Sequence, residues 1–93
     1  MKYEEVKSVK PVKKGQVIDH LEDQDAYIIQ LDESKVYQVA SIAYYVWEMC
    51  DGTKTVQDIV GEISKAANLS EEEVSGPVVQ ILEELSKAEL ISM

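Results

Sequence analysis

The chain has few of the residues on which catalysis, metal binding and disulfide cross-linking depend. Its 93 residues include one cysteine, Cys50, one histidine, His20, and no arginine. A single cysteine excludes an internal disulfide, and one cysteine with one histidine is too few for a closed structural zinc site. A nucleophile would also lack a base to orient it. The composition therefore favours a protein that is not an enzyme and that has no catalytic residue, metal or cofactor.

His20 and Cys50 both fit ordinary structural roles. His20 falls in a short extended segment beside Asp19 and Glu22, and a surface histidine needs neither a pocket nor a partner. Cys50 ends an apolar helical stretch, which is typical of a thiol that fills space in a core. We assign neither residue a redox, metal-binding or acid–base role.

The charge is unevenly distributed along the chain. Residues 1–15 hold five lysines and two glutamates, a charge of +3, and the overall charge of −9 then leaves −12 for residues 16–93. A domain that grips nucleic acid needs clustered lysine and arginine, because neutralising phosphates supplies most of the affinity. The acidic body therefore disfavours nucleic acid as a partner, and it disfavours an anionic membrane surface for the same reason.

Length and hydropathy predict one small domain. A chain of 93 residues supports one core but no second lobe. It has no run of 18 apolar residues and no apolar stretch typical of a secretion signal, so we expect a soluble, cytoplasmic protein. Residues 1–15 are basic, lack periodicity and contain Pro11 and Gly15. They predict a mobile N-terminal arm, with the folded domain over residues 16–93.

Three short extended segments begin the folded part. They are Gln16–Leu21, Ala26–Leu31 and Lys35–Val39. In the second segment, successive residues alternate between two faces, which is the two-residue period of a strand. Short polar loops separate them, and connections of this length join antiparallel neighbours. The sequence therefore predicts a three-stranded antiparallel sheet.

Three helices are expected after the sheet, which makes the fold class α+β. Apolar residues at helical spacing predict a helix from a Ser41 cap to about Cys50 and another from a Thr55 cap to Ala67. The third begins after Ser70, where three glutamates follow the cap and complement the positive end of the helix dipole.

The third helix contains a proline that conflicts with its pattern. Pro77 removes a backbone donor and crowds the carbonyl of Glu73, which costs about 3 kcal/mol in a regular helix interior. Because the helical pattern resumes at once, we expect one bent helix rather than two. Its predicted apolar face consists of Val74, Val78, Ile81, Leu82 and Leu85.

The stretch from Trp47 to Ile59 is the most specific part of the sequence. It reads W-E-M-C-D-G-T-K-T-V-Q-D-I. Here one helix ends, Gly52 can take the left-handed conformation that stops it, and Thr55 can cap the next. Two helices are therefore expected to meet at a tight corner beside a buried tryptophan.

This corner, together with the ending Ile81-Leu82-x-x-Leu85 and then Leu90-Ile91, resembles the PqqD-like family. Members of that family are leader-peptide-binding domains called RiPP recognition elements, which serve enzymes that modify ribosomally made peptides. The resemblance covers roughly residues 16–91. Pro77 and Glu89 depart from the family pattern, which indicates a divergent member.

The resemblance implies a winged helix-turn-helix-like fold and a non-catalytic adaptor. In the family, an extended leader peptide adds to the sheet beside the third strand. The adaptor presents it to a maturation enzyme, of the radical-SAM or the lasso-peptide protease type. The third strand and the last helix would then supply the peptide contacts, and Lys35 would reach an acidic side chain of the leader. The predicted contact set is Lys35, Val36, Tyr37, Gln38, Val39, Val74, Val78, Val79 and Leu82.

Several alternatives stay open at this point. Each apolar residue of that set fits ordinary core packing equally well, because groove and core share one helix. A winged helix-turn-helix transcriptional regulator would have the same helices, although glutamates on the last helix would repel phosphates. An acidic interaction subunit unrelated to peptide maturation also fits the composition. Both a monomer and a dimer are compatible with the sequence.

Overall fold

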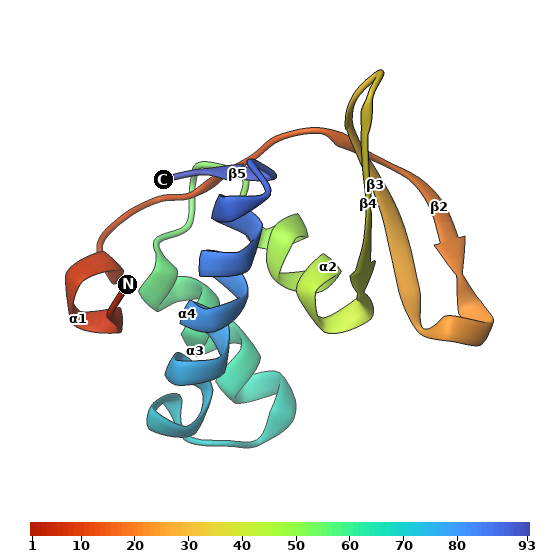
Figure 1. Cartoon of the computed structure of the whole chain (residues 1–93). Coiled ribbons are helices and arrows are strands. Elements are labelled where there is room, and N and C mark those ends of the chain that lie inside the picture. The colour runs from red at the N-terminus through yellow and green to blue at the C-terminus, as the bar shows by residue number, and fades with distance from the viewer.

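The computed structural model describes all 93 residues as a small sheet beside a group of helices (Figure 1). This is the predicted α+β class. The sheet consists of β2 (Gln16–Leu21), β3 (Ala26–Asp32) and β4 (Lys35–Ala40). The main helices are α2 (Ser41–Met49), α3 (Val56–Ala67) and α4 (Glu71–Lys87). The smaller elements are α1 (Tyr3–Val6), β1 (Val12–Lys13), the 3-10 turn η1 (Glu22–Gln24) and β5 (Ile91–Ser92).

The three-stranded sheet is an antiparallel meander with β3 in the centre, as the loop lengths predicted. Ile29 of β3 is fully buried, and its paired neighbour Tyr37 of β4 packs against the same core. Successive strand residues face opposite sides of a sheet, so one face covers the helices and the other lies towards solvent. The order β2-β3-β4 leaves β2 and β4 as the two edges.

The helix starts follow the predicted caps in two cases out of three. Thr55 and Asp58 form a reciprocal capping box at the start of α3, with N–H···O distances of 2.9 and 3.0 Å. The Ser70 hydroxyl accepts from the Glu73 amide at 3.1 Å at the start of α4. The prediction that Ser41 caps α2 is wrong: Ala40 occupies the cap position, and the Ser41 hydroxyl donates instead to Asp25 at 2.7 Å.

The last helix runs without interruption through Pro77 from Glu71 to Lys87, which confirms one helix rather than two. Its buried residues are Val74, Val78, Val79, Leu82 and Leu85.

None of the helices combines the length and the hydrophobicity that a membrane span requires.

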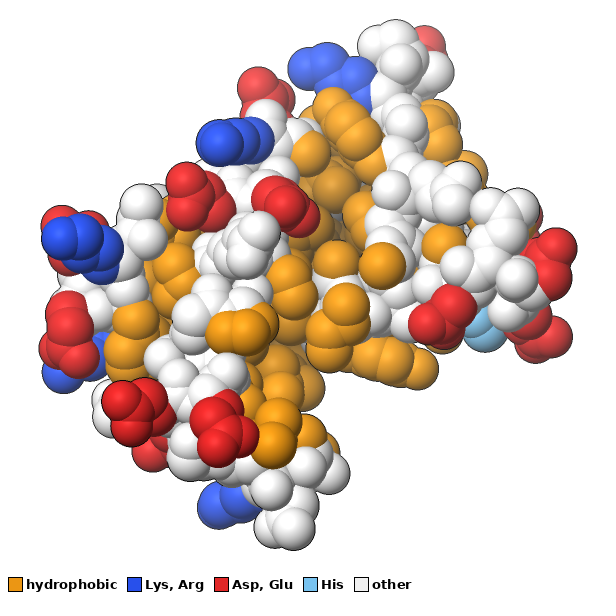
Figure 2. Space-filling model, turned by 60° about the horizontal axis from the view of Figure 1, so that its bottom comes forward, with side chains coloured by type: hydrophobic (Ala, Val, Ile, Leu, Met, Phe, Trp, Pro, Cys, Tyr) orange, Lys and Arg blue, Asp and Glu red, His pale blue; other side chains and the backbone are white.

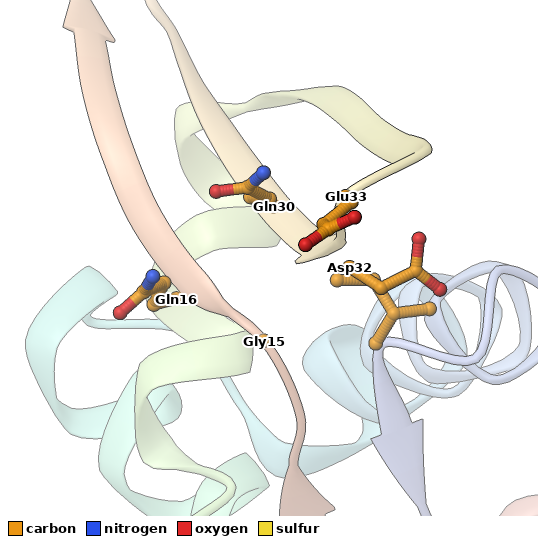
Figure 3. A pocket seen from close by; sticks show the side chains of 6 residues that line it. Gly15, Gln16, Gln30, Asp32 and Glu33 are labelled. Atoms are coloured by element: carbon orange, nitrogen blue, oxygen red, sulfur yellow. The ribbon is translucent and has the colours of Figure 1, made fainter.

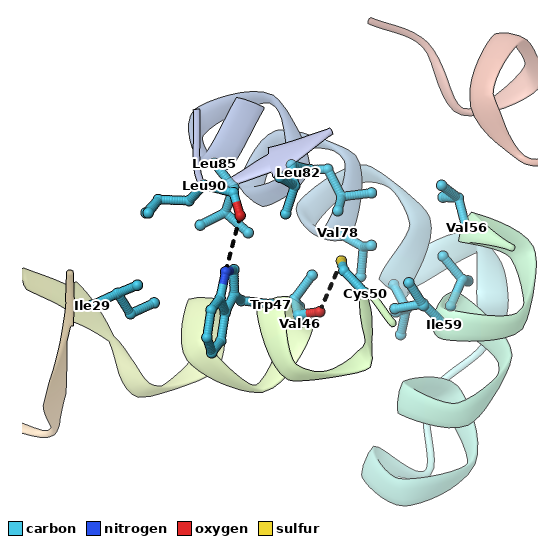
Figure 4. Packing of buried hydrophobic residues seen from close by; sticks show 13 residues of the cluster. Ile29, Val46, Trp47, Cys50, Val56, Ile59, Val78, Leu82, Leu85 and Leu90 are labelled. Carbon is cyan, nitrogen blue, oxygen red and sulfur yellow. Dashed lines mark hydrogen bonds between the residues drawn. The ribbon is translucent and has the colours of Figure 1, made fainter. Parts of the chain in front are cut away.

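The core forms where the three main helices meet the sheet (Figure 4). Trp47 is 2% exposed, and its indole N–H donates to the Leu90 carbonyl at 3.0 Å, which ties α2 to the end of the chain. Cys50 is fully buried and donates to the Val46 carbonyl at 3.2 Å. Burial raises the pKa of its thiol to about 12, so Cys50 is a packing residue, as predicted.

Residues 1–15 were expected to form a mobile arm, but the structure places them against the helices. The Val9 carbonyl accepts from Val56 at 2.9 Å, and the Pro11 carbonyl accepts from Gly52 at 3.1 Å. Pro11 is fully buried, and β1 pairs with β5 at the other end of the chain. Most of these contacts join main-chain atoms far apart in sequence, and such contacts leave no periodic signal in side chains.

Candidate functional site

The outer edge of β4 is unpaired along its length. The Ser41 amide donates to the Asp25 carbonyl at 3.0 Å, which continues the β3–β4 ladder past its last pair. Hydrogen-bonded and non-hydrogen-bonded pairs alternate along an antiparallel ladder. The N–H groups of Val36, Gln38 and Ala40 therefore point away from β3, towards the open side of the strand.

An apolar groove of about 340 Å³ lies beside this edge, between β4, the start of α2 and the C-terminal half of α4. Figure 2 shows hydrophobic side chains gathered between the helices and the sheet, where the surface is hollowed. Nine of the eleven residues that line the groove are hydrophobic. They are Tyr37, Val39, Ala40, Ile42, Ala43, Ile81, Leu85, Ala88 and Leu90, and the polar ones are Gln38 and Glu84.

The groove opens directly onto the core. Leu85 and Leu90 are 3% and 1% exposed, yet both contribute to its lining. Tyr37 and Val39 are half-buried and pack against the core from the strand side, whereas Ile42 is 54% exposed. A ligand that enters here would therefore extend the hydrophobic core and cover an exposed apolar side chain.

Most polar groups around the groove already have partners within the chain. Lys35 lies 3.7 Å from the Glu89 carboxylate, so an acidic peptide side chain would compete with an internal ion pair. The Gln38 side chain donates to Gln24 at 3.1 Å. Glu84 is exposed and forms none of the ion pairs of the structure.

The structure brings together only part of the contact set predicted from sequence. Tyr37, Gln38 and Val39 line the groove, whereas Lys35 and Val36 lie exposed on the same strand outside the lining. The predicted residues of α4 are all buried and none lines the groove: Val74, Val78 and Leu82 belong to the core cluster, and Val79 is 6% exposed.

The helix side of the groove is formed instead by α4 residues that follow Pro77. These residues, Ile81, Glu84, Leu85 and Ala88, recur at three- and four-residue spacing and so form one stripe along the helix. The stripe lies beside the core stripe and shares Leu85 with it. A second apolar stripe next to the core face was the sequence signal that could have located them.

Two other hollows differ from the groove in chemistry or in position. One of about 380 Å³ lies beside the β3–β4 turn, and only Leu31 among its lining residues is hydrophobic (Figure 3). The other, of about 470 Å³, lies between α2 and α3 and is mostly apolar, but no strand residue lines it. Only the groove beside β4 combines an apolar lining with a free strand edge.

The titratable residues form no cluster that could hold a metal ion. No three histidine, cysteine, aspartate or glutamate side chains come together in such a group. The imidazole of His20 stacks on Tyr27 with 4.1 Å between ring centroids. The site is therefore defined by shape, by apolar surface and by a row of main-chain donors.

The sequence also matches a known protein family. The family model of coenzyme PQQ synthesis protein D (PqqD) matches residues 15–91, nearly the whole chain. Curated proteins and solved structures give no match. Proteins of this family are non-catalytic accessory domains that bind a precursor peptide and a biosynthetic enzyme. The match confirms the resemblance drawn from the helix corner and the chain ending, and the chain belongs to the PqqD family, the family of RiPP recognition elements.

Proposed function

We propose that this chain is a non-catalytic adaptor that captures the leader of a ribosomally synthesised precursor peptide. The leader adds to the sheet as a strand beside β4, and the adaptor presents the peptide to a maturation enzyme. The observation that carries this proposal is the coincidence of a free strand edge with an apolar groove along the same strand. Either feature alone occurs in many small domains.

The main chain of β4 supplies affinity that depends little on peptide sequence. The outward N–H groups of Val36, Gln38 and Ala40 can donate to the carbonyl groups of an added strand. Each such bond contributes about 0.5–1.5 kcal/mol net. A leader bound in this way is held extended and in a defined register.

The groove supplies the selection among peptides. Every second side chain of an added strand points to the same face, so alternate leader residues would face Leu85, Leu90 and Ile81. Burying one aliphatic or aromatic side chain stabilises the complex by about 1.5–3 kcal/mol. Peptides with apolar residues at alternate positions are therefore favoured.

Binding by the adaptor would raise the concentration of the peptide at the enzyme without any chemistry in this chain. Holding two reactants together makes a bimolecular encounter effectively intramolecular. The partner enzyme is of the radical-SAM type or the lasso-peptide protease type, and it acts on the part of the precursor that extends beyond the leader.

A heteronuclear NMR titration with the synthetic leader of a candidate precursor peptide tests the proposal. We expect shifts confined to β4, the first turn of α2 and residues Ile81–Leu90, with a Kd between about micromolar and nanomolar. The absence of binding, or shifts centred on β2, would overturn it.

A further inference from the structure

One charged side chain in the groove has no partner within the chain. Glu84 is the only charged residue among those that line the groove. Its neighbour Glu83 lies 3.7 Å from the N-terminal amine, and Glu89 lies 3.7 Å from Lys35, so both have ion partners. Lys87, one turn further along α4, lies outside the groove lining and forms no ion pair with Glu84.

From this arrangement we propose that the captured peptide carries a lysine or arginine beside Glu84, next to the apolar side chains that enter the groove. The inference rests on the proposed function, since it concerns the peptide bound at β4. It narrows the substrate class from apolar extended peptides to extended peptides that combine apolar residues with one basic residue.

The reason is the loss of water when a peptide covers the groove. Glu84 is exposed in the free protein, so its carboxylate is hydrated. A docked strand displaces part of that water, and a carboxylate left without a partner beside nine hydrophobic residues is disfavoured. A basic side chain replaces the lost water with a charge-assisted hydrogen bond, whereas an acidic one adds repulsion.

The position of Glu84 also sets where the basic residue lies in the peptide. Glu84 immediately precedes Leu85, a buried residue of the groove lining, and Ala88 follows one turn later. The apolar peptide residue that faces Leu85 is therefore within two positions of the basic one, a span that the long side chains of lysine and arginine cover. Arginine fits better, because its planar guanidinium can bond both carboxylate oxygens.

Selection from a library of random dodecapeptides displayed on phage tests the inference, because it lets the groove itself choose the peptide sequence. The library is panned against the wild-type chain, against Glu84→Lys and against Glu72→Lys. Glu72 is an exposed glutamate of the same helix that does not line the groove. Glu72→Lys changes the net charge by the same amount as Glu84→Lys. A preference that arises from the acidity of the whole domain would therefore change equally in both variants.

We expect the wild type and Glu72→Lys to enrich alternating apolar residues with a lysine or arginine within two positions. Glu84→Lys should enrich aspartate or glutamate there instead. A peptide selected by the wild type should bind Glu84→Gln about threefold more weakly or worse, as for a partly exposed ion pair.

Different outcomes contradict the inference about Glu84 and the proposed capture at β4. Enrichment of an apolar motif with no charge preference, or with the same preference in Glu84→Lys, overturns the inference but leaves strand addition at β4 intact. If no peptide is enriched, or if enriched peptides bind Gln38→Pro as well as the wild type, capture at the β4 edge is itself wrong and the inference falls with it.

Discussion

The two edges of the sheet differ in how open they are to pairing with another chain. The β2 edge has a bulge between Val17 and Asp19, and the His20 amide donates to the Asp19 carboxylate at 2.8 Å. The β4 edge pairs regularly from Val36 to Ala40 and leaves its alternate amides without a neighbouring strand. Bulges and local bonds on an edge prevent pairing with other chains. An edge without them remains available to a peptide.

The side chains beside the two edges reinforce this difference. Near β2, the rings of His20, Tyr27 and Tyr44 form a continuous stack with centroid distances of 4.1 and 3.7 Å. These aromatic rings fill the space between that side of the sheet and α2. Near β4, the corresponding space is the apolar groove. One sheet therefore has a side closed by its own side chains and a side that a ligand can close.

The largest expected effect comes from two leucines of α4 that share a core but not a groove. Leu82 and Leu85 are both buried, and replacing either by alanine should lower the free energy of unfolding by about 3 kcal/mol. Only Leu85 lines the groove, so only Leu85→Ala should also weaken peptide binding. Urea unfolding and calorimetry with a groove-binding peptide measure the two effects. Equal losses of affinity in both variants would mean that Leu82 also contributes to peptide binding.

Leu82 and Leu85 also show how much of the groove could be predicted from the sequence. Apolar periodicity predicted that Leu82 and Leu85 lie on the buried face of one helix, and both do. Which of them meets the groove depends on how α4 crosses the sheet, and periodicity within one helix contains no information about a crossing. The strand side came from the family resemblance, which places the peptide beside the third strand, and Tyr37, Gln38 and Val39 do line the groove.

A second expected effect separates the two edges directly. Gln38→Pro removes an outward-facing amide from β4, and His20→Pro removes one from β2. Proline is tolerated on an edge strand where its missing N–H makes no bond to a neighbouring strand, and His20→Pro loses only the local bond to Asp19. Because a docked strand loses a main-chain bond and meets the proline ring, Gln38→Pro should weaken peptide binding about tenfold or more, as calorimetry would measure.

The control variant, His20→Pro, is expected to be less stable than Gln38→Pro. His20→Pro also removes the ring stacked on Tyr27, worth about 0.5–1.5 kcal/mol, so it should unfold more easily than Gln38→Pro while it binds peptide normally. If His20→Pro abolished binding and Gln38→Pro did not, the receptive edge would be β2.

A smaller effect is expected at Pro77, which lies one turn before Ile81, the first residue of α4 in the groove. Pro77→Ala restores an amide that can donate to the Glu73 carbonyl, and this changes the angle of the following turns against β4. We expect the bend at Pro77 to relieve the clash of its ring with the Glu73 carbonyl, so that only the missing hydrogen bond remains of the ~3 kcal/mol cost in a regular helix. The gained bond and the lost stiffness of the unfolded chain, each about 1 kcal/mol, should then nearly cancel in stability. Affinity should then change more than stability, and identical peptide binding by calorimetry would dismiss this role for Pro77.

Hydrogen bonds between residues far apart in the chain were not predicted from the sequence, whereas local ones were. The caps of α3 and α4 were correct because cap and partner lie three residues apart. Ser41 failed as a cap because it bonds Asp25, sixteen residues earlier. The pairing of β1 with β5 at the opposite end of the chain was not predicted for the same reason.

The smallest expected effect concerns the turn from which β4 begins. The Asp32 carboxylate accepts from the Ser34 amide at 2.9 Å, from the Ser34 hydroxyl at 3.0 Å and from the Lys35 amide at 3.0 Å. The bonds from Ser34 and the Lys35 amide hold the pKa of Asp32 below its usual 3.8. A depressed folded-state pKa stabilises the fold above 3.8, and this contribution is lost as the pH falls through the folded value.

Asp32→Asn should therefore unfold at slightly lower urea than the wild type near neutral pH, and the difference should disappear well below pH 3.8. Glu33→Gln is the matched control, because Glu33 precedes Ser34 in the same turn and its side chain forms no hydrogen bond or ion pair. Hydrogen exchange should show faster amides at the start of β4 in Asp32→Asn and unchanged amides in β2. A loss spread evenly over both edges would mean that the turn stabilises the whole sheet and does not specifically hold β4.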